Sequence, residues 1–271
     1  MTDNNGKPVI AIMEAEVNLP GSVKLAESMG FEPLPIPMVE ENNVKDGGFD
    51  NFFTQVMKTE SDYVIICGVS AIDFILRKLP YSLKDQFVEA LSRLNVIASD
   101  PDTKKSLEKA GVKVEGMPSH YSAEGLVDYL RDNTEGAVVD IDRVYSCSST
   151  LVDGLENFGA TVYETIVYNY IDPDGEAQKE LIEKSVEGGI DVFAFTNCTM
   201  VNNFLDHAKR LGHEKAIVEI LNNSVVAVMG DATAQTLRLN RVRGGIEPDN
   251  FTFEETLKVS MQAYNNSKIN S

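Results

Sequence analysis

Four short segments of this 271-residue sequence join an apolar, strand-like run to a helix-like run through small or hydroxyl-bearing residues. They are residues 67–70, 100–103, 196–199 and 230–233. In open parallel α/β sheets, ligands bind beyond the carboxyl ends of the strands, and free backbone N–H groups at helix starts bind carboxylates or phosphates. The four segments therefore predict an anion-binding edge, although Ser, Thr and Asp also cap helices that bind no ligand.

Tyrosine is the candidate for proton chemistry. Tyr163, Tyr168 and Tyr170 lie on one alternating, β-rich run, residues 161–170. A phenol with a pKa near 10 stays protonated at neutral pH, so it can donate a proton to a leaving oxygen. The alternation indicates that one face of this run is exposed, and a purely structural tyrosine on such a strand is the competing interpretation.

Sequence signatures of metal and nucleotide sites are missing. The sequence has no GxGxxG or GxxxxGK(S/T) pattern and no GxSxG pattern. Its three histidines and three cysteines lack the spacing of zinc ligands. We therefore expect no metal site, and nucleotide binding has no support from a motif.

The net charge of −18 argues against nucleic-acid binding, which needs a basic surface. It also argues against binding to anionic membranes. No apolar run approaches the length that spans a bilayer, and residues 1–7 lack the apolar core of a signal peptide. We expect a monomeric, cytoplasmic protein whose partner is a small molecule.

The second half of the sequence repeats the first at an offset of about 130 residues. Asp62 and the apolar run after it align with Asp191 and its run, and Gly30 aligns with Gly159. A repeat of this length indicates two similar domains with a ligand cleft between them. A simple tandem duplication would divide the chain near residue 134.

Strand-like and helix-like runs alternate throughout, which indicates an α/β protein with parallel sheets flanked by helices, of the doubly wound, flavodoxin-like kind. Residues 32–38 contain three prolines and are expected as an edge strand or an extended crossing between domains. Residues 161–170 are expected as one long strand and residues 112–114 as a short one. The C-terminal residues 265–271 are expected to be frayed.

The sequence resembles the uroporphyrinogen-III synthase family along nearly its whole length. The resemblance lies in the order and spacing of DVFAFTNCTMVNNF, VVAVMGDATAQTL, GATVYETIVYNY and HYSAEGLVDYL. The run VIASDPDTKKSLEKAGVKV is similar to a first-domain counterpart of the second motif. The resemblance implies two domains, residues 1–36 with 170–271 and residues 37–169. A two-stranded linker near residues 32–38 and 163–170 would join them.

The resemblance also implies a reaction, the cyclisation of hydroxymethylbilane to uroporphyrinogen III with inversion of ring D. This is a cyclising dehydration, a lyase reaction, and it needs no cofactor. Tyr168 matches the family tyrosine that assists hydroxide departure, and Arg143 could pair with a substrate carboxylate. The residues expected to line the cleft match family motifs or, for Ser70, the internal repeat: Ser70, Thr103, Thr196, Asn197, Thr199, Gly230 and Thr233.

Four positions depart from the family pattern. Met13-Glu14 stands where many members have Arg, Cys67-Gly68 where Thr-Ser is usual, Asn197 where Ser is usual, and Asp100 where Gly is usual. Together these changes remove a cation and hydroxyl groups and add negative charge. The alternative hypothesis is therefore a non-catalytic, tetrapyrrole-binding or regulatory protein on the same scaffold.

Overall fold

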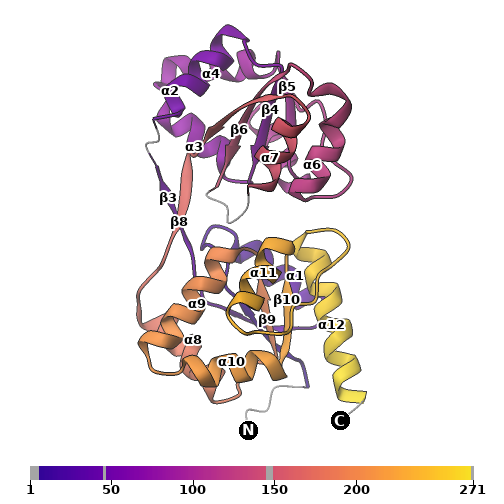
Figure 1. Cartoon of the computed structure of the whole chain (residues 1–271). Coiled ribbons are helices and arrows are strands. Elements are labelled where there is room, and N and C mark those ends of the chain that lie inside the picture. Colours follow the sequence, from indigo (N-terminus) through magenta and orange to yellow (C-terminus); the bar gives the residue numbers. More distant parts are fainter. Residues whose placement is uncertain (1–5, 45–46, 145–148, 270–271) are drawn as a thin grey trace. The chain divides into compact units, whose positions relative to one another are not determined.

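The computed structural model describes residues 6–44, 47–144 and 149–269 (Figure 1). The chain forms two compact units. Unit 1 comprises Met1–Glu41 with Tyr170–Ser271, and unit 2 comprises Asn42–Asn169. Each unit is a parallel four-stranded sheet with helices packed on it, so the structure confirms the expected α/β class.

The sheet of unit 1 has the order β10-β9-β1-β2. Its strands alternate apolar side chains between two covered faces: Phe193 and Phe195 pack towards one, Val192 and Ala194 towards the other. The strands are β1 (Val9–Ile12), β2 (Glu32–Pro35), β9 (Val192–Phe195) and β10 (Val225–Val228). Burial on both faces explains why β9 and β10 are continuously apolar.

The helices of unit 1 divide between these two faces. Residues of α8 (Glu176–Val186), α9 (Cys198–Arg210), α10 (Glu214–Asn223) and α11 (Asp231–Leu239) join the core on the Phe193 side. Residues of α1 (Leu19–Ser28) and α12 (Phe253–Ile269) pack on the Val192 side.

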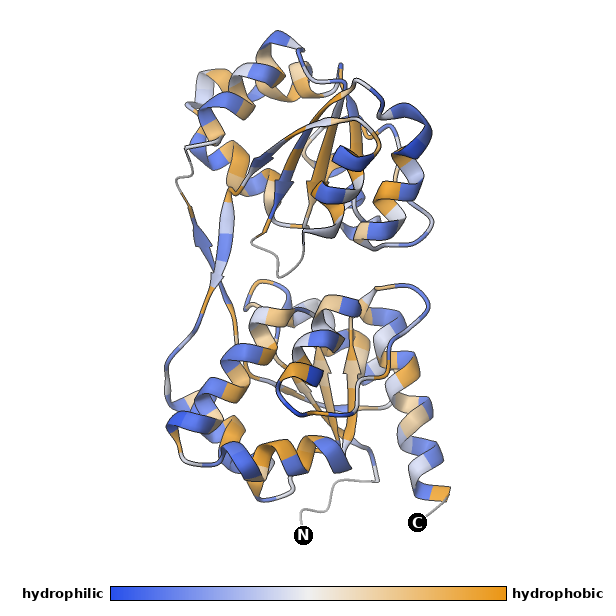
Figure 2. Ribbon diagram, in the orientation of Figure 1, coloured by the Kyte–Doolittle hydropathy of each residue, from blue (hydrophilic) through white to orange (hydrophobic). Residues whose placement is uncertain are grey.

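The sheet of unit 2 has the order β5-β4-β6-β7. Its strands are β4 (Tyr63–Cys67), β5 (Asn95–Ala98), β6 (Val138–Arg143) and β7 (Thr161–Thr165). One face packs on α6 (Ala123–Leu130) and α7 (Thr150–Asn157). The remaining helices are α2 (Phe49–Lys58), α3 (Ala71–Lys78), α4 (Tyr81–Leu91), α5 (Pro101–Lys109) and the short η1 (Arg131–Asn133). Strands β9 and β10 of unit 1 and the middle of β4 in unit 2 are apolar (Figure 2).

The repeat appears in the structure as two sheets with one strand order. Each half of the sequence supplies two neighbouring strands to each sheet: β1 and β2 lie in unit 1, and β4 and β5 in unit 2. A division near residue 134 is therefore wrong, because Thr134 lies inside unit 2. The two halves exchange strands instead of folding separately.

A further pair of strands, β3 (Glu40–Asn43) and β8 (Tyr168–Ile171), forms a two-stranded sheet in which Asn42 Nδ2 donates to Asn169 Oδ1 at 3.0 Å (Figure 1). In contrast to β9 and β10, this pair is largely hydrophilic (Figure 2). The boundary between the units falls within both strands. Residues 32–35 are not part of this pair but form β2, an edge strand that tolerates prolines.

Three other local expectations are wrong. Residues 161–170 are two strands, β7 and β8, interrupted at Ile166 and Val167. Residues 112–114 form no strand, and an isolated bridge joins Ile97 to Gly116 instead. Residues 265–269 continue α12 and do not fray, while 270–271 lie outside the described residues.

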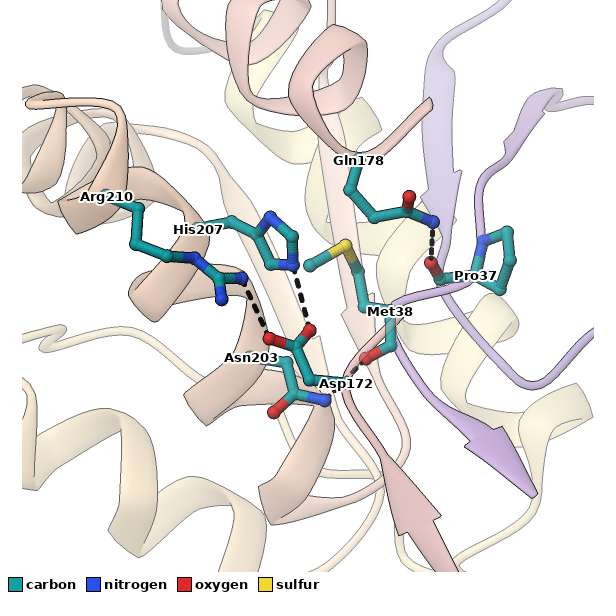
Figure 3. Close-up of polar contacts among 7 residues, drawn as sticks. All are labelled: Pro37, Met38, Asp172, Gln178, Asn203, His207 and Arg210. Carbon is teal, nitrogen blue, oxygen red and sulfur yellow. Dashed lines mark hydrogen bonds and ion pairs between the residues drawn. The ribbon is translucent and has the colours of Figure 1, made fainter. Parts of the chain in front are cut away.

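Side chains of unit 1 hold the backbone that leads into β3 (Figure 3). The Gln178 amide of α8 donates to the Pro37 carbonyl at 2.8 Å. The Asn203 amide of α9 donates to the Met38 carbonyl at 2.7 Å. These bonds satisfy backbone oxygens beyond the edge strand.

The backbone that follows β8 is held by a charged contact on the same helix. Asp172 Oδ1 lies 2.8 Å from His207 Nε2, and Asp172 Oδ2 accepts from Arg210 at 2.8 Å (Figure 3). The His207 ring is buried, whereas the Arg210 side chain is half exposed. Helix α9 therefore fixes both linker segments at the point where each meets unit 1.

None of the helices in the described part of the chain is long and apolar enough to cross a membrane.

Candidate functional site

In unit 1, the expected site residues meet at one edge of the sheet. β9 and β10 are neighbouring parallel strands, and the Met229 N–H donates to the Phe195 carbonyl at 2.9 Å where the strands end. Helices α9 and α11 begin within a few residues of these ends. The structure thus brings together five expected residues: Thr196, Asn197, Thr199, Gly230 and Thr233.

The two helix starts at this edge differ in how they are capped. Asn197 caps α9, because its Oδ1 accepts the Met200 N–H at 2.8 Å. Gly230 precedes α11 with φ 108°, a conformation that favours glycine, and supplies no side-chain cap. The backbone N–H groups at the start of α11 are therefore the better anion donors.

An acidic pair lies beside the start of α11. Burial, then a hydrogen bond to Asp231 and its negative charge, raise the pKa of Glu247, while Arg238 opposes the rise. This negative charge acts against an anionic ligand at the same helix start.

In unit 2, the start of α5 is occupied by its own cap. Asp100 Oδ1 accepts the Thr103 N–H at 2.9 Å, and Oδ2 accepts the Thr103 hydroxyl at 2.7 Å. Ser99 donates to the same Oδ2 at 2.6 Å. Thr103 is buried, and its hydroxyl is bound to the capping carboxylate. This arrangement is typical of a helix cap that binds no ligand.

Replacing Asp100 with Ala should lower the free energy of unfolding by about 1 kcal/mol, because α5 loses its cap. Urea denaturation of the variant and the parent protein measures the difference. The matched control is Asp102→Ala in the first turn, which loses only a helix-dipole interaction of a few tenths of a kcal/mol. Equal losses in both variants would contradict the capping role.

Tyr168 is the first residue of β8, and its hydroxyl lies beside Gly68, directly after the carboxyl end of β4. Its ring stacks on Phe74 of α3 with centroids 4.8 Å apart, and the residue is 1% exposed. A side chain at Gly68 would collide with the Tyr168 hydroxyl, and Gly68 has φ +128°. The departure from the family pattern at position 68 therefore has a steric reason: glycine leaves room for the phenol oxygen.

Two charged residues that were not predicted from the sequence, the buried Asp142 and the partly buried Lys78, lie close to the backbone just before this tyrosine. Asp142 on β6 is completely buried. Burial raises its pKa to about 8, against the opposing effects of the Val167 backbone and the Lys78 charge. The Lys78 ammonium donates to the Val167 carbonyl at 2.6 Å, one residue before Tyr168. Burial also lowers the pKa of Lys78.

A second acid lies two residues earlier on β6. Asp140 is buried and accepts a hydrogen bond from the Ser61 hydroxyl. Burial raises its pKa to about 6, and the Ser61 bond opposes the rise. The signal in the sequence was the pattern VVDIDR, two acids at strand spacing inside an apolar strand.

Arg143 ends β6 and forms an ion pair with Glu164 on the neighbouring β7. Its side chain is 18% exposed, so the expected ligand cation already has a carboxylate partner inside unit 2. Ser70 precedes α3 without a side-chain bond to the helix start.

Unit 2 thus gathers four expected residues at the carboxyl edge of its sheet: Ser70, Thr103, Arg143 and Tyr168. Across the described ranges, no group of three or more His, Cys, Asp or Glu side chains could hold a metal ion.

A family model and several known proteins match this chain. The family model described as "Uroporphyrinogen-III synthase HemD" matches residues 22–258. A Methanothermobacter thermautotrophicus protein, provisionally assigned as uroporphyrinogen-III synthase, is 27% identical over 247 residues, 89% of this chain and 93% of that protein. The Chlorobaculum parvum uroporphyrinogen-III synthase is 25% identical over 230 residues, 84% of this chain and 88% of that one.

The fold of a solved structure is also similar. A mutant uroporphyrinogen III synthase from the extremely thermophilic bacterium Thermus thermophilus superposes with a TM-score of 0.60 at 20% identity, covering 96% of this chain and 99% of that one.

Proposed function

Because this chain belongs to the uroporphyrinogen-III synthase family, we propose that it cyclises hydroxymethylbilane to uroporphyrinogen III with inversion of ring D. The observation that carries the proposal is the position of Tyr168, whose hydroxyl lies over Gly68 at the carboxyl end of a central parallel strand. Ligands of parallel α/β sheets bind at this end of the strands.

The chemistry begins with the departure of hydroxide from the terminal carbon of the linear substrate. The Tyr168 hydroxyl donates its proton to the leaving oxygen, which gives water and a cationic azafulvene. The substituted carbon of ring D attacks this cation to form a spiro intermediate. That intermediate fragments and recloses through the other ring position.

The spontaneous reaction closes the ring without inversion, so the main task of the protein is to fold the substrate into the right geometry. The substrate carries eight carboxylates, and a chain of net charge −18 must hold them with local donors. The start of α11 and the side chains of Thr196, Asn197 and Thr199 supply such donors in unit 1.

A second candidate, a binding or regulatory protein without turnover, is favoured by two contacts. Arg143 is paired with Glu164, and the Thr103 hydroxyl is bound to Asp100. Both residues were expected to bind substrate carboxylates. A protein that does not turn over hydroxymethylbilane would not require either of them to do so.

The rate at which hydroxymethylbilane disappears separates the two candidates. The synthase should consume freshly prepared substrate well above the rate of spontaneous closure measured without protein. A fluorescence or calorimetric titration that detects binding, together with consumption at the spontaneous rate, would overturn the synthase and leave the binding protein.

A further inference from the structure

A hollow with a volume of about 830 Å³ lies on unit 1, away from the proposed synthase site. It is formed by α10 and by the loop that follows α11, at the amino end of β10. The Gly230 helix start lies at the opposite, carboxyl end of the same strand. The lining residues are Lys215, Val218, Glu219, Asn222, Asn223, Arg241 and Arg243.

Three of the lining side chains are cations and one is an acid, Glu219. Within the described residues, no ion pair neutralises Lys215, Arg241 or Arg243. The chain as a whole has a net charge of −18, and its overall field repels anions. This group of three cations is therefore a local exception, where an anion would be attracted.

The repeat offers an internal comparison at the same place in unit 2. There Ser92 Oγ accepts the Lys113 N–H at 3.0 Å, as Asn222 Oδ1 accepts the Arg243 N–H at 2.7 Å in unit 1.

The charges at the two places differ. Lys113 is neutralised by Glu115, whose Oε2 lies 3.1 Å from its ammonium. The position equivalent to Glu115, at the repeat offset of about 130 residues, is a glycine. The equivalent of Lys215 is an aspartate, Asp85. Only the unit 1 copy is therefore cationic.

The backbone conformation of Arg241 also sets this hollow apart. Arg241 has φ 66°, in the left-handed region that costs a non-glycine residue energy. The equivalent residue of unit 2 is Gly111, with φ +86°. The Asn222 amide holds the Arg241 carbonyl at 3.1 Å. A competing explanation for these cations is that they stabilise the negative, carboxyl-terminal ends of α10 and α11. That stabilisation does not require an arginine at position 241, where the backbone favours glycine.

We propose that this hollow binds a small polyanion bearing phosphate or carboxylate oxygens, which Arg241 and Arg243 recognise. Two arginines present planar forks of donors that match such oxyanions. The volume lies within the range of ligand pockets, about 300–1,000 Å³. This site is separate from the synthase site, and its test needs no turnover.

Inorganic tripolyphosphate and citrate, titrated by calorimetry at an ionic strength of about 0.15 M, test the proposal. The parent protein should bind at least one of them saturably, and the preferred probe identifies phosphate or carboxylate recognition. Arg241→Gly should weaken that binding roughly tenfold, because one charged hydrogen-bonding group is lost. Its melting temperature should not fall, since glycine suits this backbone.

The matched control is Lys113→Ala, which removes the equivalent cation of unit 2. It should leave the affinity unchanged, while Arg243→Ala should weaken it as Arg241→Gly does. The proposal is overturned if neither probe binds saturably. It is also overturned if Arg241→Gly and Lys113→Ala have equal affinities for the bound probe.

Discussion

Replacing Tyr168 with Phe should lower the turnover of hydroxymethylbilane by roughly 10²- to 10⁴-fold, the usual contribution of a positioned proton donor. The substitution removes one oxygen and keeps the ring that stacks on Phe74. The fold and the KM should therefore change little, and the loss should fall on kcat. Steady-state kinetics of the purified variant measures this division.

Tyr163→Phe is the matched control, because this tyrosine is 45% exposed on β7. Its turnover should equal that of the parent protein. If Tyr168→Phe turns over at the parent rate, Tyr168 is a structural residue and the proton must come from elsewhere. If both variants lose activity equally, the effect is not specific to the strand end at Gly68.

Replacing Asp142 with Asn should change how the stability of the protein depends on pH. Burial raises the pKa of Asp142 from its ordinary value of 3.8 to about 8. Between these two values the folded protein keeps a proton that the unfolded chain has lost. The free energy of unfolding therefore falls as pH rises, on the order of 1 kcal/mol per pH unit, and levels off above pH 8.

Asn cannot ionise, so the variant should lose this slope and be more stable than the parent protein at pH 8 by several kcal/mol, of the order that a shift of this size implies. At pH 4 the two proteins should differ little. Urea denaturation across this pH range provides the measurement. The matched control, Asp140→Asn, should flatten the curve only up to about pH 6, where that carboxyl titrates. Parallel curves for parent and Asp142→Asn would contradict the raised pKa.

Periodicity predicted most of the fold. The alternation of apolar runs with helical runs placed β9 and α9 correctly, because a strand buried on both faces is continuously apolar. The strand exchange between the halves was not visible in the repeat itself, because periodicity carries no information about which strands pair. The break at Ile166 between β7 and β8 was hidden for a similar reason: both sides favour extended backbone.

The sequence predicted where these helices start, but not whether a side chain caps the backbone N–H groups at each start. Asp100 and Asn197 cap their own helices, whereas Gly230 leaves its helix start without a side-chain cap. A sequence pattern predicts the cap residue and not whether its donors remain free.

The acids Asp140 and Asp142 were missed because apolar periodicity treats polar residues in a strand as exposed, and only the sheet order shows β6 to be central. Arg143 was recognised as a cation. Its pairing with Glu164 depends on the register of β6 and β7, which the sequence does not state.

The isomer formed from hydroxymethylbilane tests the central claim most directly. Purified protein is mixed with fresh substrate, the products are oxidised to porphyrins, and the type I and type III isomers are separated by chromatography. The synthase predicts type III well above a protein-free control, since spontaneous closure does not invert ring D. Type I alone, formed at the spontaneous rate, would contradict the claim and leave a protein that uses this scaffold without catalysing the inversion.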